Sequence, residues 1–589
     1  MYGRSDQARH RLSRVGAGSY RVVGVLLLVA LAFALAACGS KSKATITVLS
    51  AGDVDYLDPG LAYYQFSYEV IYTVDRPLIS YKAGSTVYQP DMAASLPTLS
   101  ADGKTVTVHL RKGVKFAPPV NREVTSADVK YAIERGFAQS VPNSYTAVYF
   151  NTLVGAPTTP PATPKNLDIP GITTPDKYTL VFKLSKPSGT FVAALSLPLT
   201  APVPEEYASE FDNKKQSDYG FHQVATGPYM IKNDKSGNVS GVGYIAEQKI
   251  ELVRNPNWNA KTDFRPAYAD RIVFKEGFED PTVMAKKILA GTGDVNGDSP
   301  IPPSELKSIT SNASQKKQLF FSQTSGSRYV PLNMSKPPFD NIHIRKAVAY
   351  ILDRNAMRLT RGGAIDGKIA THFIDPTFGD HGFTQSGGIS FAPFKTAGFK
   401  GDLAKAMAEM KLAGYPSGKY TGPQITMVAD NAPPGSDTAQ VVANSLGKIG
   451  FKVKISSVKH STMYTQFCNV PKNEPNICPN AGFMADFAEP QAVLDAAFNG
   501  KMILPINNSN WAQLNDPQIN AAMEAAKVIV DPTKRYEAWG KIDQMITNTA
   551  AGIPWLWETW PTLFSTNVEP ALQLWNGGSP DVAFMKVKK

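Results

Sequence analysis

Apolar and polar residues follow two different periods along this chain, which indicates both strands and helices. Strict alternation predicts strands at residues 45–50, 105–110 and 178–184. Apolar residues three and four positions apart predict helices over residues 67–75 and 402–413. Because both periods recur throughout the chain, the sequence predicts a protein that contains both strands and helices.

One stretch combines the two periods in a recognisable order. Residues 425–429, 438–449 and 452–457 predict a strand, a helix and a second strand, which is the βαβ pattern of a parallel sheet. Residues 190–199 fit a strand or a helix equally well, and periodicity does not decide between them. Further strands are predicted at 249–254, 270–275, 329–334 and 553–559, and further helices at 125–135, 281–289, 344–352, 517–530 and 533–547.

The N-terminus has the pattern of an export signal. Five arginines precede an apolar run over residues 22–37, which ends in Leu-Ala-Ala before Cys38. The run is shorter than the roughly 20 apolar residues of a spanning helix, so a permanent transmembrane helix is disfavoured. The ending resembles a bacterial lipobox, which implies a signal peptide over 1–37, lipidation of Cys38 and a tether over 38–43. An ordinary signal followed by a chance cysteine is the alternative.

Composition and charge narrow the class of protein. Removal of residues 1–37 takes away five Arg and one Asp, which lowers the net charge from +11 to +7 and leaves 552 of 589 residues. That length suffices for two or more domains. The basic residues form no long run, so we expect no nucleic-acid partner.

Two cysteines remain after Cys38, namely Cys468 and Cys478. In an oxidising exterior an even number favours a disulfide, which would close the segment 469–477. Two free thiols are the alternative.

Motifs of common enzyme classes are absent. None of the seven histidines lies in an HExxH motif, and the chain has no GxSxG motif. Residues 362–368 nearly match a P-loop, but Ile369 stands where a Ser or Thr would hold magnesium. We therefore expect a protein that is not an enzyme and uses no metal or cofactor. A secreted hydrolase is the weaker hypothesis, because it needs a nucleophile–base pair.

Several ordered motifs together resemble one family, the peptide-binding class of ABC-transporter solute-binding lipoproteins, which includes the oligopeptide and dipeptide binders. The resemblance runs from about residue 45 to the C-terminus. Its motifs are LDP at 57–59, PDMA at 90–93, KTVTVHLRKGVKF at 104–116, TSADV at 125–129, ATGPY at 225–229, LVRNP at 252–256, IRKA at 344–347 and ADFAEP at 485–490.

The resemblance implies a two-lobed α/β periplasmic-binding-protein fold, a hinged trap with mixed sheets that closes over a ligand. Lobe I would span 44–325 with an extra subdomain near 82–200, lobe II would span 326–562, and residues 563–589 would return to lobe I. The function implied is that of a monomer anchored to the outer face of the bacterial cytoplasmic membrane, which captures peptides and delivers them to an ABC permease. The same fold binding an oligosaccharide, a siderophore or a metal chelate is the alternative.

The candidate ligand-binding residues centre on Asp486, a carboxylate between two aromatic residues. An ionised carboxylate taken out of water needs a cation, and the resemblance implies that Asp486 pairs with the α-amino group of a peptide. A helix N-cap or an internal salt bridge is the alternative for this residue. By the same resemblance, backbone groups of Gly482 and Met484 would bind the peptide, and Phe483 would line a side-chain pocket or belong to the core.

The first lobe would meet the ligand through Tyr63 and Gln65, and Tyr329 is a further candidate. Some oligopeptide binders have an Arg six residues before the acid, where it meets the ligand carboxylate. This chain has Asn480 at that position. Recognition of the peptide C-terminus therefore stays open.

Overall fold

The folded part of the chain is built around two main sheets. The computed structural model describes residues 44–143, 145–299, 301–378 and 391–588. The predicted signal peptide, Cys38 and most of the tether lie outside these residues. Within the described part, no helix is long and apolar enough to cross a membrane.

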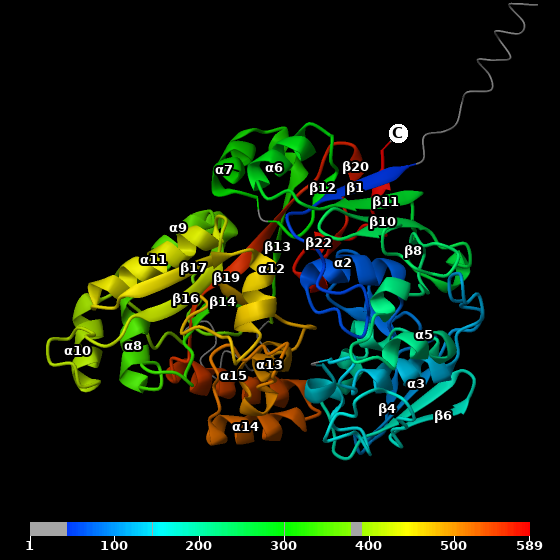
Figure 1. The fold of residues 1–589 in the computed structure, drawn as a ribbon, viewed down its shortest axis with the longest axis horizontal. Coiled ribbons are helices and arrows are strands. Elements are labelled where there is room, and N and C mark those ends of the chain that lie inside the picture. The colour runs from blue at the N-terminus through cyan, green and yellow to red at the C-terminus, as the bar shows by residue number, and fades with distance from the viewer. Residues whose placement is uncertain (1–43, 144, 300, 379–390, 589) are drawn as a thin grey trace, which may run out of the picture. The chain divides into compact units, whose positions relative to one another are not determined.

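The first sheet has the strand order β12-β1-β11-β10-β8 (Figure 1). Strand β1 runs parallel to its neighbours β11 and β12, whereas β10 runs antiparallel to β11 and β8. Helix α2 (Gln65–Val74) buries every residue except Gln65, so only its first residue is left accessible. The strands are β1 (Thr45–Leu49), β8 (Tyr229–Ile231), β10 (Lys249–Arg254), β11 (Arg271–Lys275) and β12 (Val295–Asn296).

A smaller antiparallel sheet lies within the predicted subdomain near residues 82–200. Its strand order is β4-β5-β7-β6. Helix α3 (Ser126–Arg135) starts where the sequence predicts, and its Asp128 carboxylate accepts a 2.7 Å bond from the Thr125 N–H. Residues 190–199 contain two short helices, α4 (Phe191–Ala194) and η2 (Pro198–Thr200). The strands are β4 (Thr98–Leu99), β5 (Thr105–His109), β6 (Ile172–Asp176) and β7 (Thr179–Lys183).

The second main sheet has the strand order β13-β19-β14-β18, and these pairs are antiparallel. The predicted βαβ unit is confirmed beside it, because β16 (Ile425–Asp430) and β17 (Val453–Val458) pair in parallel on either side of α11 (Gly435–Lys448). Figure 1 shows these elements in yellow and green, next to helix α8 (Ile342–Ile351). The sheet strands are β13 (Leu319–Gln323), β14 (Gly326–Pro331), β18 (Ala481–Met484) and β19 (Gly552–Leu563).

Strand β19 links two hydrophobic cores. All twelve of its residues are buried. Ile553 and Trp555 near its start pack in the core of the second sheet, whereas Leu563 at its end packs with Leu49 and Leu319. The chain then returns to the first sheet through a bridge between Val295 and Phe564. A strand buried along its whole length explains why residues 553–559 form an apolar, aromatic run.

A buried ionic cluster fixes β19 against β14. Glu558 accepts a 2.7 Å bond from Arg328 Nε and a second bond from Arg361. All three side chains are almost fully buried. Arg361 also lies 3.5 Å from Asp366. Because both arginines have carboxylate partners, this buried charge is compensated.

We predict that Glu558→Gln lowers the free energy of unfolding by about 3 kcal/mol, because removal of one partner leaves buried guanidinium groups without compensation. The measurement is the urea midpoint at pH 7. Glu569→Gln is the matched control, since Glu569 and its partner Lys586 are both about half exposed (52% and 49%) and exposed pairs contribute little. Equal midpoints for the two variants would contradict the structural role of Glu558.

Candidate ligand-binding site

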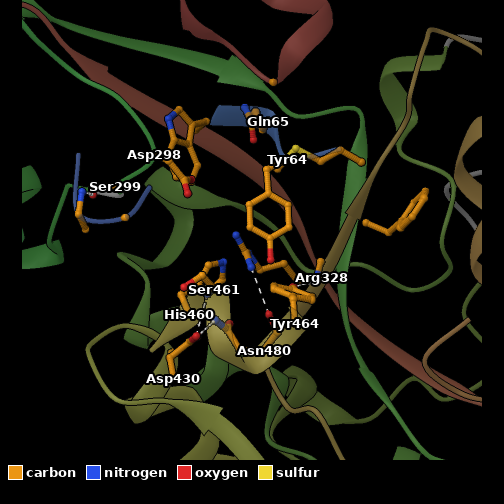
Figure 2. A pocket seen from close by; sticks show the side chains of 18 of the residues that line it. Tyr64, Gln65, Asp298, Ser299, Arg328, Asp430, His460, Ser461, Tyr464 and Asn480 are labelled. Atoms are coloured by element: carbon orange, nitrogen blue, oxygen red, sulfur yellow. Dashed lines mark hydrogen bonds and ion pairs between the residues drawn. The ribbon is translucent and has the colours of Figure 1, made fainter. Parts of the chain in front are cut away.

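A cavity of about 300 Å³ lies between the two main sheets. The start of α2 and the loop after β12 form one wall, and β14, β18 and the segment after β17 form another (Figure 2). Of the seven residues predicted to bind ligand, all except Tyr329 line this cavity. They are Tyr63, Gln65, Gly482, Phe483, Met484 and Asp486.

Strand β18 is an edge strand, and its free edge faces the cavity. It pairs with β14 on one side, and the N–H of Ala485 donates to the Ser325 carbonyl as that pairing ends. In an antiparallel pair the hydrogen-bonded positions alternate. The backbone groups of Gly482 and Met484 therefore point away from β14, toward the cavity. The Gly482 N–H donates to the Tyr464 hydroxyl at 3.2 Å.

Close approach of β14 makes this geometry possible. A Cβ on Gly326 would lie 2.3 Å from the Phe483 carbonyl oxygen, so only glycine allows the strand to pass here. Asp486 lines the cavity two residues beyond the end of β18. It caps no helix, because α13 (Gln491–Phe498) starts five residues later with Pro490 at its N-cap.

Asp486 has hydrogen-bond partners but no cation. Its carboxylate accepts bonds from the Tyr149 hydroxyl at 2.7 Å and the Tyr145 hydroxyl at 3.3 Å. No described Lys, Arg or His forms an ion pair with it. Burial raises the pKa of Asp486 to about 7, although both tyrosine bonds act to lower it. Within the described residues, Asp486 therefore neither caps a helix nor forms an internal salt bridge, the two alternatives raised from the sequence.

The sequence analysis missed the tyrosines that surround this carboxylate. Tyr145 immediately precedes the π-helix η1 (Thr146–Phe150), and Tyr149 lies within it. The Tyr145 ring lies 5.3 Å from the Tyr63 ring, and Tyr149 lies 4.9 Å from Phe487. They lie more than 330 positions from Asp486 in the sequence. The only local signal is their spacing of four residues, which places two hydroxyls on one side of a helical turn.

Tyr63 and Gln65 both line the cavity, and the polar group of each side chain has hydrogen-bond partners within the protein. The Tyr63 hydroxyl lies 3.2 Å from the Ser509 hydroxyl. The Gln65 amide nitrogen donates to the Asn576 carbonyl at 2.7 Å and to the Ser579 hydroxyl at 3.0 Å. Gln65 therefore holds the C-terminal segment in place.

Phe483 combines the two roles expected for it, since it lines the cavity and also packs 6.0 Å from the Trp511 ring. The expectation for Tyr329 is corrected. Its side chain is 1% exposed and packs against Phe373 and Trp511 in the core, away from the cavity. The neighbouring Arg328 lines the cavity instead, because successive residues of a strand face opposite sides.

The wall around Asn480 carries charges that are paired with one another. The Asn480 amide donates to Asp430 at 2.6 Å, and the His460 Nδ1 lies 2.7 Å from the same carboxylate. Burial acts to lower the pKa of His460, but Asp430 outweighs it and the pKa is raised. Among the described residues no group of His, Cys, Asp and Glu has the arrangement of a metal site.

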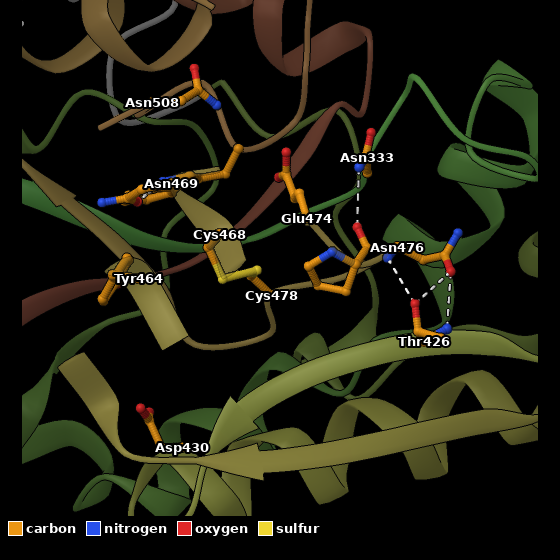
Figure 3. The surroundings of a disulfide bond; sticks show 12 residues. Asn333, Thr426, Asp430, Tyr464, Cys468, Asn469, Glu474, Asn476, Cys478 and Asn508 are labelled. Carbon is orange, nitrogen blue, oxygen red and sulfur yellow. Dashed lines mark hydrogen bonds between the residues drawn. A yellow bond between two sulfur atoms is a disulfide. The ribbon is translucent and has the colours of Figure 1, made fainter. Parts of the chain in front are cut away.

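Cys468 and Cys478 form a disulfide with an S–S distance of 2.06 Å (Figure 3), and the nearby residues Asn469 and Asn480 line the cavity. The Asn469 side chain accepts a 2.8 Å bond from the Trp511 indole N–H. At the other end of the loop, Ile477 forms bridges with Leu332 and Met427. The loop thus connects β16 and the chain after β14 to the cavity wall.

This chain is similar to known proteins over most of its length. The family model of bacterial extracellular solute-binding proteins, family 5 (middle region), matches residues 87–502. Heme-binding protein A of Haemophilus influenzae is 26% identical, with 81% of this chain and 80% of the relative covered. Di/tripeptide-binding protein 1 of Pseudomonas aeruginosa is 25% identical, with 80% and 81% covered.

Among solved structures, the ABC transporter-associated periplasmic binding protein DppA from Helicobacter pylori, in complex with the peptide STSA, has a TM-score of 0.75 at 20% identity. The match covers 93% of this chain and 99% of that one. The expected two-lobed α/β fold is therefore confirmed, and these relatives are binding proteins rather than enzymes. On the strength of a family model that covers most of its length, this chain belongs to family 5 of the bacterial extracellular solute-binding proteins.

Proposed function

We propose that this chain is the lipid-anchored binding component of an ABC importer, which captures short peptides by their free amino terminus. The observation that carries the proposal is Asp486, a half-buried carboxylate that has no cation among the described residues and lies just beyond an edge strand that faces a cavity. A peptide α-ammonium group supplies the missing charge and the hydrogen-bond donors together. The tyrosine hydroxyls hold the carboxylate in position.

The backbone of the ligand would pair with β18. Gly482 and Met484 present backbone groups on the open edge, and an extended peptide can add there as an extra strand. A cavity of about 300 Å³ is at the lower end of the range for ligand pockets, which favours a short peptide. The printed names of relatives include a di/tripeptide binder and a protein solved with a four-residue peptide.

Anchoring and delivery complete the proposal. Cys38 would carry the lipid at the outer face of the cytoplasmic membrane, and the closed protein, a monomer, would present its ligand to the permease. The domain limits proposed are 44–325 with the subdomain near 82–200, 326–562, and 563–589. They place Asp486 in the second lobe and its tyrosine partners in the first.

A non-peptide ligand is the second candidate function. It is favoured by the relative named Heme-binding protein A, which is as similar to this chain as the named peptide binder. Mass spectrometry of ligand retained through native purification separates the two candidates, because peptides and tetrapyrroles or other solutes differ in mass and absorbance.

We predict that short peptides with a free amino terminus stabilise the mature protein and that their N-acetylated forms do not. Acetylation removes the charge that Asp486 requires, while the rest of the ligand is unchanged. Asp486→Asn should weaken binding of the free peptides by about tenfold to a hundredfold, since hydrogen bonds to charged groups contribute about 1.5–3 kcal/mol. Titration calorimetry and thermal unfolding with ligand measure both effects.

Asp340→Asn is the control, because it makes the same chemical change at an exposed residue that is not part of the cavity lining. Equal affinity for free and acetylated peptides, or unchanged affinity in Asp486→Asn, would remove amine recognition from the proposal. Failure of every peptide to bind would favour the second candidate function.

We predict that peptide affinity rises with pH between 5 and 7. Burial raises the pKa of Asp486 to about 7, and only the ionised carboxylate pairs with an ammonium group. Below that pKa, affinity should fall by about tenfold for each pH unit, because the competent fraction falls in the same proportion. Asp486→Asn should show no such dependence. Calorimetry at pH 5, 6 and 7 is the measurement.

The ligand-free protein should show the opposite sign. The folded-state pKa of Asp486 lies above the ordinary value of 3.8, so the folded state binds the proton more tightly than the unfolded chain. The contribution of this carboxyl to stability is therefore present at low pH and is lost as the pH rises from about 4 to about 7. A flat difference in thermal midpoint between wild type and Asp486→Asn over this range would contradict the assignment.

A further inference from the structure

The charged side chains of the cavity wall pair with opposite charges, with three exceptions among the described residues. Arg328 and Arg361 share Glu558, and Arg361 has Asp366 as well. Two acids also have cationic partners, since Asp430 lies 2.7 Å from His460 and the exposed Glu279 lies 3.8 Å from Lys459. Asp53 accepts hydrogen bonds from the neutral donors Tyr244 Oη and the Glu247 N–H. The exceptions are Asp53 and Asp486, which accept hydrogen bonds but have no cation, and a third carboxylate, Asp298.

Asp298 lines the cavity from the wall of the first sheet, just after β12. In the described part of the chain its carboxylate has neither a hydrogen bond nor an ion pair. Figure 2 shows Asp298 on the same cavity as Tyr64, His460 and Ser461. Burial raises the pKa of Asp298, and the longer-range attraction of His460 and Arg328 offsets part of that rise. Both of these cations have nearer carboxylates of their own.

The loop that carries Asp298 is held rigidly. The Gly297 N–H donates to the Leu49 carbonyl at 2.8 Å, and the Asn296 amide donates to the Ser299 carbonyl at 3.0 Å. The Ser299 hydroxyl accepts a 2.9 Å bond from the Ala51 N–H. A Cβ on Gly297 would lie 2.9 Å from the Phe66 ring, so the loop packs tightly against α2. The chain therefore holds the backbone at Asp298 against the cavity wall.

Two other polar groups near this part of the cavity also lack partners. Asn480 is 3% exposed and lines the cavity, and its side-chain carbonyl oxygen has no donor among the described residues. The Tyr64 hydroxyl also has no hydrogen-bond partner among the described residues, and burial raises its pKa, with a further contribution from the charge of Asp298. Buried polar atoms are normally hydrogen-bonded, so unpaired acceptors in a cavity wall indicate that a ligand supplies donors.

We propose that Asp298 is a specificity-determining residue that pairs with a second positive charge on the ligand, a Lys or Arg side chain of the bound peptide. The inference rests on the proposed function, in which Asp486 takes the amino terminus. An uncompensated carboxylate favours a cationic side chain over a neutral one of the same size. A guanidinium group also brings several N–H donors, as the unpaired acceptor of Asn480 requires.

The test compares tripeptides of alanine in which one position is replaced in turn by lysine, arginine or the neutral isostere norleucine. With wild-type protein, the basic peptides should bind about tenfold to a hundredfold more tightly than the norleucine peptides at one position of the three. Asp298→Asn should remove this preference and leave the affinity for the norleucine peptides unchanged. Titration calorimetry at pH 7 measures both results.

Glu279→Gln is the matched control, because Glu279 lines the same cavity but is mostly exposed and pairs with Lys459. It should keep the preference for basic peptides. Equal affinity of wild-type protein for basic and norleucine peptides at all three positions would overturn the inference without any need for a variant. An equal loss for both kinds of peptide in Asp298→Asn would also overturn it, since that result indicates a structural role.

The two proposals fail in different ways. If norleucine peptides bind through Asp486 and basic residues add nothing, amine capture stands and the role of Asp298 is rejected. If no peptide of the series binds, both proposals are rejected together.

Discussion

A carboxylate taken out of water raises the free energy of the protein unless a cation or a proton neutralises it. Most charged groups around this cavity meet the requirement internally, as Glu558 does between two arginines. Asp486 and Asp298 do not. Their unfavourable energy is located where a ligand can relieve it, so the electrostatics of the empty cavity already select for positive charge. The raised pKa of Asp486 expresses the same fact, since a proton is the simplest cation available.

The fold delivers this arrangement through two long-range constraints. Strand β19 is buried along its whole length and belongs to both cores, so it fixes the second sheet relative to the loop after β12. Gly326 lets β14 approach β18 closely, which leaves the outer edge of β18 facing the cavity. The disulfide loop then attaches the cavity wall to β16. An exposed edge strand can pair with another chain and cause aggregation. The free edge of β18 faces the cavity instead of the outer surface.

Much of the fold could be predicted from the sequence because its elements have clear local periods. The βαβ unit at β16, α11 and β17 and the apolar run of β19 are examples. Residues 190–199 were ambiguous because two short helices leave no period to detect. The ligand-binding site was harder to predict from the sequence than the fold. Tyr329 was predicted to face the cavity, but its side chain lies on the opposite face of β14. Side chains alternate between the two faces of a strand, so an error of one residue exchanges the cavity face for the core face. Tyr149 joins Asp486 only through tertiary structure.

The position of Asn480 limits how the other end of a peptide can be held. Where an arginine would meet a ligand carboxylate, this chain has an amide that already donates to Asp430. The nearby guanidinium groups of Arg328 and Arg361 are occupied by Glu558. A peptide without basic side chains brings one positive and one negative terminus, and so adds a carboxylate to a wall whose described cations are already paired. A basic side chain restores the balance. Because Asn480 stands in place of an arginine, the C-terminus of a bound peptide has no fixed cationic partner. The cavity therefore favours a ligand of net positive charge, as the carboxylates of Asp298 and Asp486 also do.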